Sequence, residues 1–273
     1  HCGADAVYIG ATLFSARQNA HNFDAAALRE AADFCHTNGV KLYLTVNTLV
    51  FDTEWAALDE LLQTAAAVGM DACIVQDLGV ADYIHQRIPE MPLHASTQMT
   101  ICSPSGAIWA KEHGFSRVVV AREMTRSEIQ AVCAIGLEVE QFVHGALCMC
   151  ISGQCYLSAL IGARSANRGC CAQACRLPFT AAKNPQAAAL SLKDLCLVPY
   201  VAELAVTPLS AALCRWHCFS ENRGQNETAG ICSGSGYRSP ATESGQTARF
   251  TDVTCGILSQ RIHRRLLYRT AKT

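Results

Sequence analysis

Hydrophobic runs alternate with amphipathic segments from residue 6 to residue 144, and this alternation limits the possible folds more than any other feature of the chain. The runs are predicted to be strands at Ala6–Gly10, Lys41–Asn47, Ala72–Gln76, Leu93–Thr97, Arg117–Ala121 and Leu137–His144. They are apolar on both faces, which is typical of a buried parallel sheet. Strands and helices that alternate with short connections predict parallel βαβ units.

The amphipathic segments carry signals for the start and the end of helices. Pro104 stands at a first helical position, and Glu128 completes a capping box. The predicted caps are Asp24, Thr53, Ser103 and Thr125, and the predicted stops are Gly39, Gly69, Gly114 and Gly136.

Six such units predict an α/β fold of the TIM type, an incomplete (β/α) barrel. An open sheet is disfavoured because no Gly-rich dinucleotide fingerprint follows any strand. In a barrel the chemistry lies at the carboxyl ends of the strands. The polar residues predicted there are Asn47, Gln76, Asp77, His94, Gln98, Arg122, Glu123 and His144.

The bulk composition excludes some classes of protein. The net charge of −1 argues against a generally basic nucleic-acid binder, although a local basic patch is compatible with it. No apolar run is long enough to span a bilayer and none has the pattern of a signal peptide, so we expect a cytoplasmic protein without a membrane partner. The sequence opens at His1 almost directly on a strand, and we expect that a first barrel strand is missing.

The cysteines are numerous and unevenly spread. Six of the sixteen lie between Cys148 and Cys175. Such clustering favours a metal or redox site over a disulfide framework. The spacing matches neither a zinc ribbon nor a ferredoxin, and it leaves an Fe–S cluster, zinc and buried free thiols as alternatives. Three other cysteines on apolar faces are predicted to be core residues: Cys35, Cys73 and Cys133.

Long motifs surround these cysteines and resemble those of the U32 peptidase family, the collagenase-like proteins. They are His94-Ala-Ser-Thr-Gln-Met-Thr100, Glu140-x-Phe142-x-His144-Gly-Ala-Leu-Cys148, Ser152-Gly-Gln-Cys155-x-x-Ser158, Gly162-x-Arg164-Ser165-x-Asn167-Arg168-Gly169 and Cys171-Ala-Gln-x-Cys175-Arg176-Leu-Pro178. The resemblance covers roughly residues 3 to 204, so a chance match is improbable.

The resemblance implies a 4Fe–4S cluster and assigns its ligands. These would be Cys148, Cys155, Cys171 and Cys175. Relatives usually have Arg where this chain has Cys170, and Cys150 lies nearby, so either of these thiols is an alternative ligand.

The resemblance also implies a function, because several members are O₂-independent hydroxylation factors for tRNA, rRNA or ubiquinone synthesis. We expect hydroxylation of a base in structured RNA, with an inactive remnant or a protease acting on peptides as the alternatives. No Gly-x-Ser-x-Gly or His-Glu-x-x-His motif supports the protease. The candidate catalytic residues are His144, Glu140 and His94. The candidate substrate-binding residues are Arg164, Arg168 and Arg176, which suit phosphate or carboxylate groups.

The organisation along the chain has three predicted parts. Residues 1–145 form the barrel core that lacks its first strand. Residues 146–205 form the Cys-rich cluster-binding segment and a following βα unit. Residues 206–273 form an aberrant, disordered tail without visible period. A zinc site made by Cys214, His217 and Cys218 is the competing interpretation of the tail.

The tail is predicted to be a frameshifted product. Synonymous codons for residues 221–233 encode a family-like phrase, Lys-Thr-Glu-Gly-Arg-Met-Lys-Arg-Pro-Glu-Tyr-Val, when they are read from the second nucleotide. The same shift over residues 261–269 gives a second family phrase. We therefore expect that the frame slips between about Ala205 and Cys214. Sequencing the gene is the measurement, and codons that forbid this second reading would refute the prediction.

Overall fold

The computed structural model describes residues 4–18, 20, 22–179 and 189–197, without the side chains of His144 and Cys196, together with the backbone of residues 214–219 and 231–234. The strands are β1 (Ala6–Gly10), β2 (Lys41–Val46), β3 (Ala72–Val75), β4 (Leu93–Ala95), β5 (Phe115–Val119), β6 (Glu138–Gly145), β7 (Leu195–Cys196), β8 (Cys214–Phe219) and β9 (Ile231–Gly234). The α-helices are α1 (Ala25–Thr37), α2 (Trp55–Ala67), α3 (Leu78–Arg87), α4 (Pro104–Glu112), α5 (Arg126–Cys133) and α6 (Leu157–Gly162). Short 3₁₀ turns are η1 (Asp52–Glu54), η2 (Thr97–Met99), η3 (Ala166–Arg168) and η4 (Ala174–Arg176).

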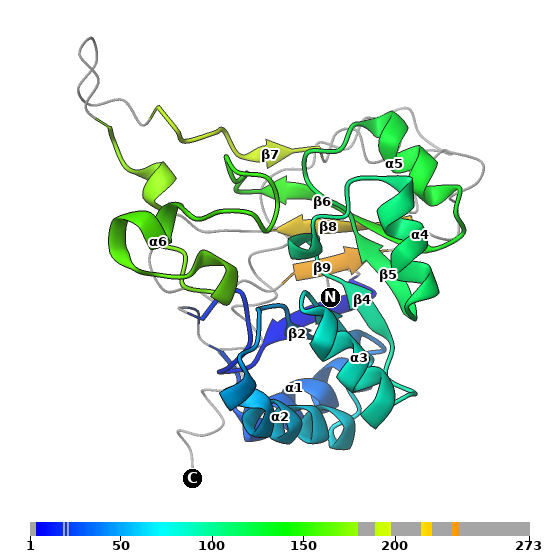
Figure 1. Ribbon diagram of the computed structural model, residues 1–273. Helices are drawn as coiled ribbons and strands as arrows, with labels where there is room; N and C mark the ends of the chain where they lie inside the picture. Colours follow the sequence, from blue (N-terminus) through cyan, green and yellow to red (C-terminus); the bar gives the residue numbers. More distant parts are fainter. Residues whose placement is uncertain are drawn as a thin grey trace, which may run out of the picture.

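Strands β1 to β6 form one curled parallel sheet in chain order, with the helices α1 to α5 outside it (Figure 1). Each of the strands β1 to β5 is followed by a helix that returns the chain to the same end of the sheet, as in a TIM barrel. The expected α/β fold, an incomplete TIM-like barrel, is therefore confirmed.

Two short strands are described within residues 206–273, the expected tail, whose disorder stays a prediction. Strand β8 pairs in parallel with β6, and β9 pairs antiparallel with both β8 and β1. The residues of β8 alternate between apolar and polar types, which is the period of a strand. The antiparallel β9 departs from the all-parallel order of a TIM barrel. The rest of the expected tail, and the shifted-frame phrases outside β9, lie beyond the described residues.

The predicted helix caps are confirmed at three of four positions. Asp24 accepts a hydrogen bond from the amide of Ala27, and Ser103 accepts one from Gly106. Thr125 and Glu128 form the capping box. The prediction for Thr53 is wrong because this residue lies inside the turn η1, which leads into α2.

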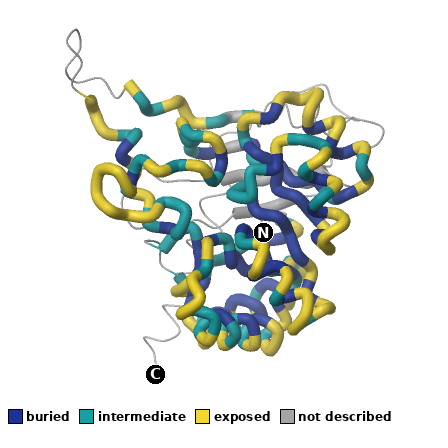
Figure 2. The backbone as a smooth tube through the Cα atoms, in the orientation of Figure 1, coloured by how far each residue is buried: buried dark blue, intermediate teal, exposed yellow. Residues whose placement is uncertain are grey.

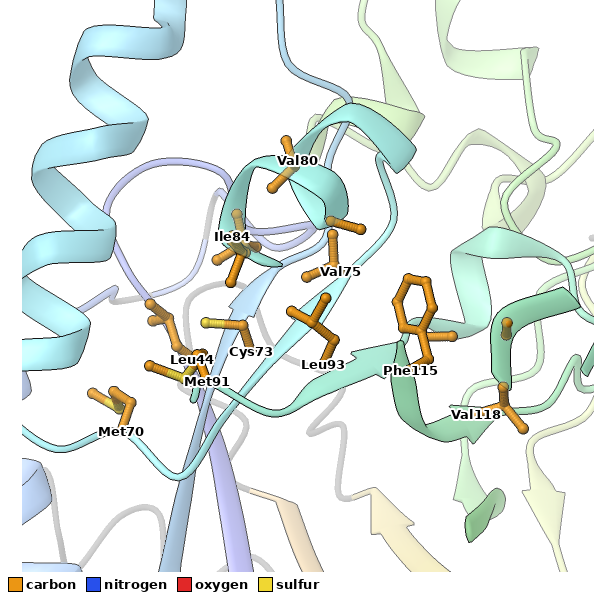
Figure 3. Packing of buried hydrophobic residues seen from close by; sticks show 14 of the residues in the cluster. Leu44, Met70, Cys73, Val75, Val80, Ile84, Met91, Leu93, Phe115 and Val118 are labelled. Atoms are coloured by element: carbon orange, nitrogen blue, oxygen red, sulfur yellow. The ribbon is translucent and has the colours of Figure 1, made fainter. Parts of the chain in front are cut away.

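The residues between sheet and helices form the main hydrophobic core. Burial follows the strands and the inner sides of the helices (Figure 2). Side chains of β2, β3, β4 and β5, such as Leu44, Cys73, Leu93 and Val118, pack with Val80 and Ile84 of α3 and with other buried residues (Figure 3). Burial raises the pKa of the Cys73 thiol to about 12, so this cysteine is a core residue, as predicted.

The opposite face of the sheet encloses a smaller cluster made by Ala6, Tyr43, Ala72 and Ile74. Strand residues alternate between the two faces, which explains why these strands are apolar on both sides. Within the described residues, no helix is long and apolar enough to cross a membrane.

Candidate functional site

The Cys-rich segment, residues 146–179, begins where β6 ends and lies beside the barrel with α6 (Figure 1). Its contacts are with loops that follow strands, namely those after β1, β2, β4 and β5. These loops all lie at the carboxyl ends of the parallel strands, where barrels carry their chemistry. The Cys-rich segment therefore lies at the end of the barrel where the sequence predicts the site.

Ser152 joins this segment to two of the loops and is fully buried. Its hydroxyl donates to the Glu123 carboxylate at 3.0 Å and accepts from Arg122 Nε at 3.1 Å, and its amide also donates to Glu123. Its carbonyl accepts from the hydroxyl of Thr100 at 2.6 Å. Arg122 and Glu123, two predicted rim residues, therefore hold the loop between Cys148 and Cys155.

The next residue, Gly153, has a positive φ of 75° and packs directly on the carbonyl of Gln98. A Cβ atom at this position would overlap with that carbonyl oxygen. Gly169 repeats the arrangement with a φ of 81° against the carbonyl of Ser15. Only glycine combines this backbone conformation with so close an approach. Both glycines thus allow the Cys-rich segment to pack closely against the barrel rim.

Arg168 fastens the segment to the loop after β2. Its guanidinium donates to both oxygens of Glu54, at 2.9 and 2.5 Å, and to the carbonyl of Leu49 at 2.6 Å. It also lies over the ring of Phe51, 4.1 Å from the centroid. The hydrogen bond from Arg168 lowers the pKa of Glu54.

Arg176 ties the same segment to residues 191–194. It donates to the hydroxyl of Ser191 at 2.9 Å and to the carbonyls of Leu192 and Leu147, at 2.6 and 3.0 Å. Two of the three arginines expected to bind substrate, Arg168 and Arg176, thus make internal contacts. The third, Arg164, is exposed.

The four cysteines expected to bind a cluster lie in one electrostatic neighbourhood. The pKa of the Cys175 thiol is raised first by burial and then by the charge of Cys148, with smaller effects of Cys171 and Cys155, while Arg176 opposes the rise. All four are free thiols. The hydrogen bond from Arg176 to the carbonyl of Leu147 brings the end of the segment to its start.

The two additional cysteines differ in their surroundings. The Cys170 thiol donates to Gln18 Oε1 at 2.9 Å and is thereby held against the loop after β1. Burial and the charges of Cys155 and Cys148 raise the pKa of Cys150, so this thiol lies near the group.

The donor set consists of soft ligands, because four free thiols suit zinc or an iron–sulfur cluster. Among the described residues, no three His, Cys, Asp or Glu side chains are spaced to hold one metal ion. A zinc ion draws its four ligand atoms to about 2.3 Å from one centre. In a 4Fe–4S cluster each thiolate binds a different iron, so the sulfur atoms stay farther apart. The four free thiols have the ligand chemistry that such a cluster requires.

Two of the expected catalytic residues lie in the barrel interior and not with the cysteines. Glu140 is buried and accepts from Arg117 Nη1 at 3.1 Å, and Arg117 also donates to Glu138. His94 is buried with its ring edge-on to Tyr43, 4.7 Å between centroids. The third candidate, His144, lies near the end of β6, and its side chain is outside the described residues.

Several structural roles of residues at the rim and in the barrel interior were not predicted from the sequence. Asp77, a predicted rim residue, instead caps α3 by accepting from the amides of Gly79 and Val80. Arg117 was assigned only to a strand, although a charged residue inside an apolar run is a signal for a polar barrel interior. The anchoring role of Ser152 depends on partners about 30 and 50 residues away, and no local pattern announces it.

Comparison with known proteins identifies relatives over most of the chain. The family model described as Peptidase family U32 matches residues 1–212. The 23S rRNA 5-hydroxycytidine C2501 synthase of Escherichia coli is 44% identical over 179 residues, which are 65% of this chain and 27% of that protein. The tRNA hydroxylation protein P1 of Bacillus subtilis is 34% identical over 193 residues, 70% of this chain and 46% of that protein.

A third relative has the name of a protease. The collagenase of Porphyromonas gingivalis is 36% identical over 191 residues, 65% of this chain and 45% of that protein. The chain thus spans less than half the length of each of these three relatives.

Replacing Gly153 with alanine is expected to destabilise the protein by roughly 1–3 kcal/mol, since the added Cβ would meet the Gln98 carbonyl in a left-handed conformation. Urea denaturation of the purified chain measures the change. Gly162→Ala is the matched control, because no atom lies within 4 Å of the position that a Cβ would take there and alanine favours a helix. Equal stabilities of the two variants would contradict the assigned packing of the loop.

Replacing Arg168 with glutamine is expected to lower the free energy of unfolding by about 1 kcal/mol at pH 7. Because the pKa of Glu54 is lowered in the folded state, its stabilising effect is complete above its unfolded pKa of about 4.3 and is lost as the pH falls through the folded value. The difference between wild type and variant should therefore shrink in acid. Denaturation at pH 7 and below pH 4 tests this, with exposed Arg29→Gln as the control. A difference that does not change with pH would argue against the ion pair.

Proposed function

This chain belongs to peptidase family U32, and on that basis we propose that it takes part in the hydroxylation of an RNA base at an iron–sulfur site. The observation that supports the proposal best is that Cys148, Cys155, Cys171 and Cys175 are free thiols of one segment, which hydrogen bonds fasten to the rim of the barrel. The names of two relatives, which modify rRNA and tRNA, supply the reaction class and the substrate class.

The four cysteines would hold a 4Fe–4S cluster, which when bound supplies electron transfer. The protein residues would determine how the cluster is held. The amide of Gln173 donates to Cys171 Sγ at 3.3 Å, and the hydroxyl of Ser158 lies 4.0 Å from the same sulfur. Such donors stabilise the thiolate form that a metal requires.

The positive charge of Arg176 has a similar effect on the group. It lies next to Cys175 in sequence, opposes the rise in the pKa of that thiol, and contacts the carbonyl of Leu147 beside Cys148. A cation near thiolate ligands offsets their negative charge. We therefore assign Arg176 to the support of the proposed cluster and not to the substrate.

A protease is the second candidate, and the collagenase relative is the observation that favours it. A hydrolytic site needs a nucleophile with a base in hydrogen-bond reach. In the barrel interior, the Glu140 carboxylate is engaged with Arg117, and the cysteines near the rim lie among other thiols. Among the described side chains these contacts support metal binding more than peptide cleavage.

Substitution of each proposed ligand by serine should lower the iron and sulfide bound after anaerobic reconstitution, from about four iron atoms per chain in the wild type. Cys170→Ser is the matched control beside Cys171→Ser and should keep the wild-type content, because its thiol is held by Gln18. Colorimetric iron and sulfide assays measure both. Iron loss in Cys170→Ser with retention in Cys171→Ser would overturn the ligand set, and gelatin cleavage by metal-free protein would favour the protease.

A further inference from the structure

The Cys-rich segment carries large apolar side chains that face solvent. Around α6 these are Tyr156, Leu160 and Ile161, with exposed fractions of 64%, 82% and 59%. The exposed stretch around α6 is visible in Figure 2. We call Tyr156, Leu160, Ile161 and the exposed Arg164 the α6 surface. Apolar groups gathered on one exposed element mark a surface that contacts a partner.

The α6 surface is adjacent to the proposed cluster site. Tyr156 directly follows Cys155 in the chain. On the other side of the helix, the buried Ser158 accepts from the amide of Ala172 at 3.0 Å and lies beside Cys171. The helix is therefore fixed to the cysteines by one side, while the tyrosine ring remains exposed within one residue of a proposed ligand.

The charge of the Cys-rich segment indicates which kind of partner it can bind. Residues 146–179 contain three arginines and no Asp, Glu or Lys, in a chain whose net charge is −1. Arg168 and Arg176 are bound internally, so Arg164 presents its charge to solvent. A surface with apolar groups, one aromatic ring and a cation, but without carboxylates, suits a polyanion that also has flat apolar faces.

We propose that the α6 surface docks the RNA substrate, with an unpaired base stacked on Tyr156 and a backbone phosphate at Arg164. This inference rests on the proposed function. A protein that modifies a base must take it out of the stack, and the neighbouring bases then expose their faces. Aromatic rings receive such faces, and Leu160 and Ile161 provide apolar contact beside them. A base stacked on Tyr156, next to Cys155, would direct the adjacent nucleotide of the RNA toward the proposed cluster site.

The test is the affinity of the full chain for a fluorescein-labelled RNA stem–loop with an unpaired loop, measured anaerobically by fluorescence anisotropy. Tyr156→Ala should weaken binding by roughly 5- to 150-fold, and Tyr156→Phe should keep most of the affinity because its ring remains. Arg164→Ala should weaken binding and reduce the salt dependence by about one counterion. The controls Leu78→Ala and Arg29→Ala alter exposed residues of α3 and α1 and should bind as the wild type does.

Several results would overturn the proposal: no RNA binding by the wild type, unchanged binding by Tyr156→Ala, equal losses in the controls, or displacement of the RNA by gelatin peptides. Iron and sulfide are determined on the same samples. A chain that holds its iron but binds RNA independently of Tyr156 refutes the docking surface alone. A chain without iron that binds RNA through Tyr156 supports the docking surface and refutes the cluster.

Discussion

The contact between Ser152 and the barrel rim determines where the cysteines of this protein lie. The side chain and both backbone polar groups of one buried residue are satisfied by Glu123, Arg122 and Thr100, which come from two different loops. Buried polar groups that are fully paired define a single arrangement, since any shift leaves one of them without a partner. The loop between Cys148 and Cys155 therefore has a fixed position over the strand ends.

The barrel interior imposes a second constraint. It contains charged side chains, whereas the interior of most barrels is filled by hydrophobic ones. Arg117 bridges Glu138 and Glu140 and lies 5.2 Å from the centre of the Tyr43 ring. Removing one partner of such a buried set leaves an uncompensated charge, which is strongly destabilising. Glu140 thus has a structural role as the buried partner of Arg117. The strands that carry these interior charges also lead to the rim against which the Cys-rich segment is held.

The sequence predicts the barrel well because hydrophobic period and helix caps are local signals. The strand at Ala6–Gly10 and the caps at Asp24 and Ser103 were found in this way. Contacts between distant residues were not predictable: the thiol of Cys170 is held by Gln18, 152 residues earlier. The start of α2 was misplaced because Glu54, and not Thr53, closes the preceding turn by accepting from the amide of Phe51.

The Cys-rich segment is fastened to loops from four separate βα units, and this has a thermodynamic consequence. A ligand that binds only the folded arrangement stabilises every element that maintains it. Binding of a cluster by the four thiols would therefore stabilise the loops of the rim, and intact loops would in turn favour that binding. If the four thiols bind the proposed cluster, its removal by an oxidant would loosen loops far apart in the chain, and a mutation that disrupts any of these loops would weaken cluster binding.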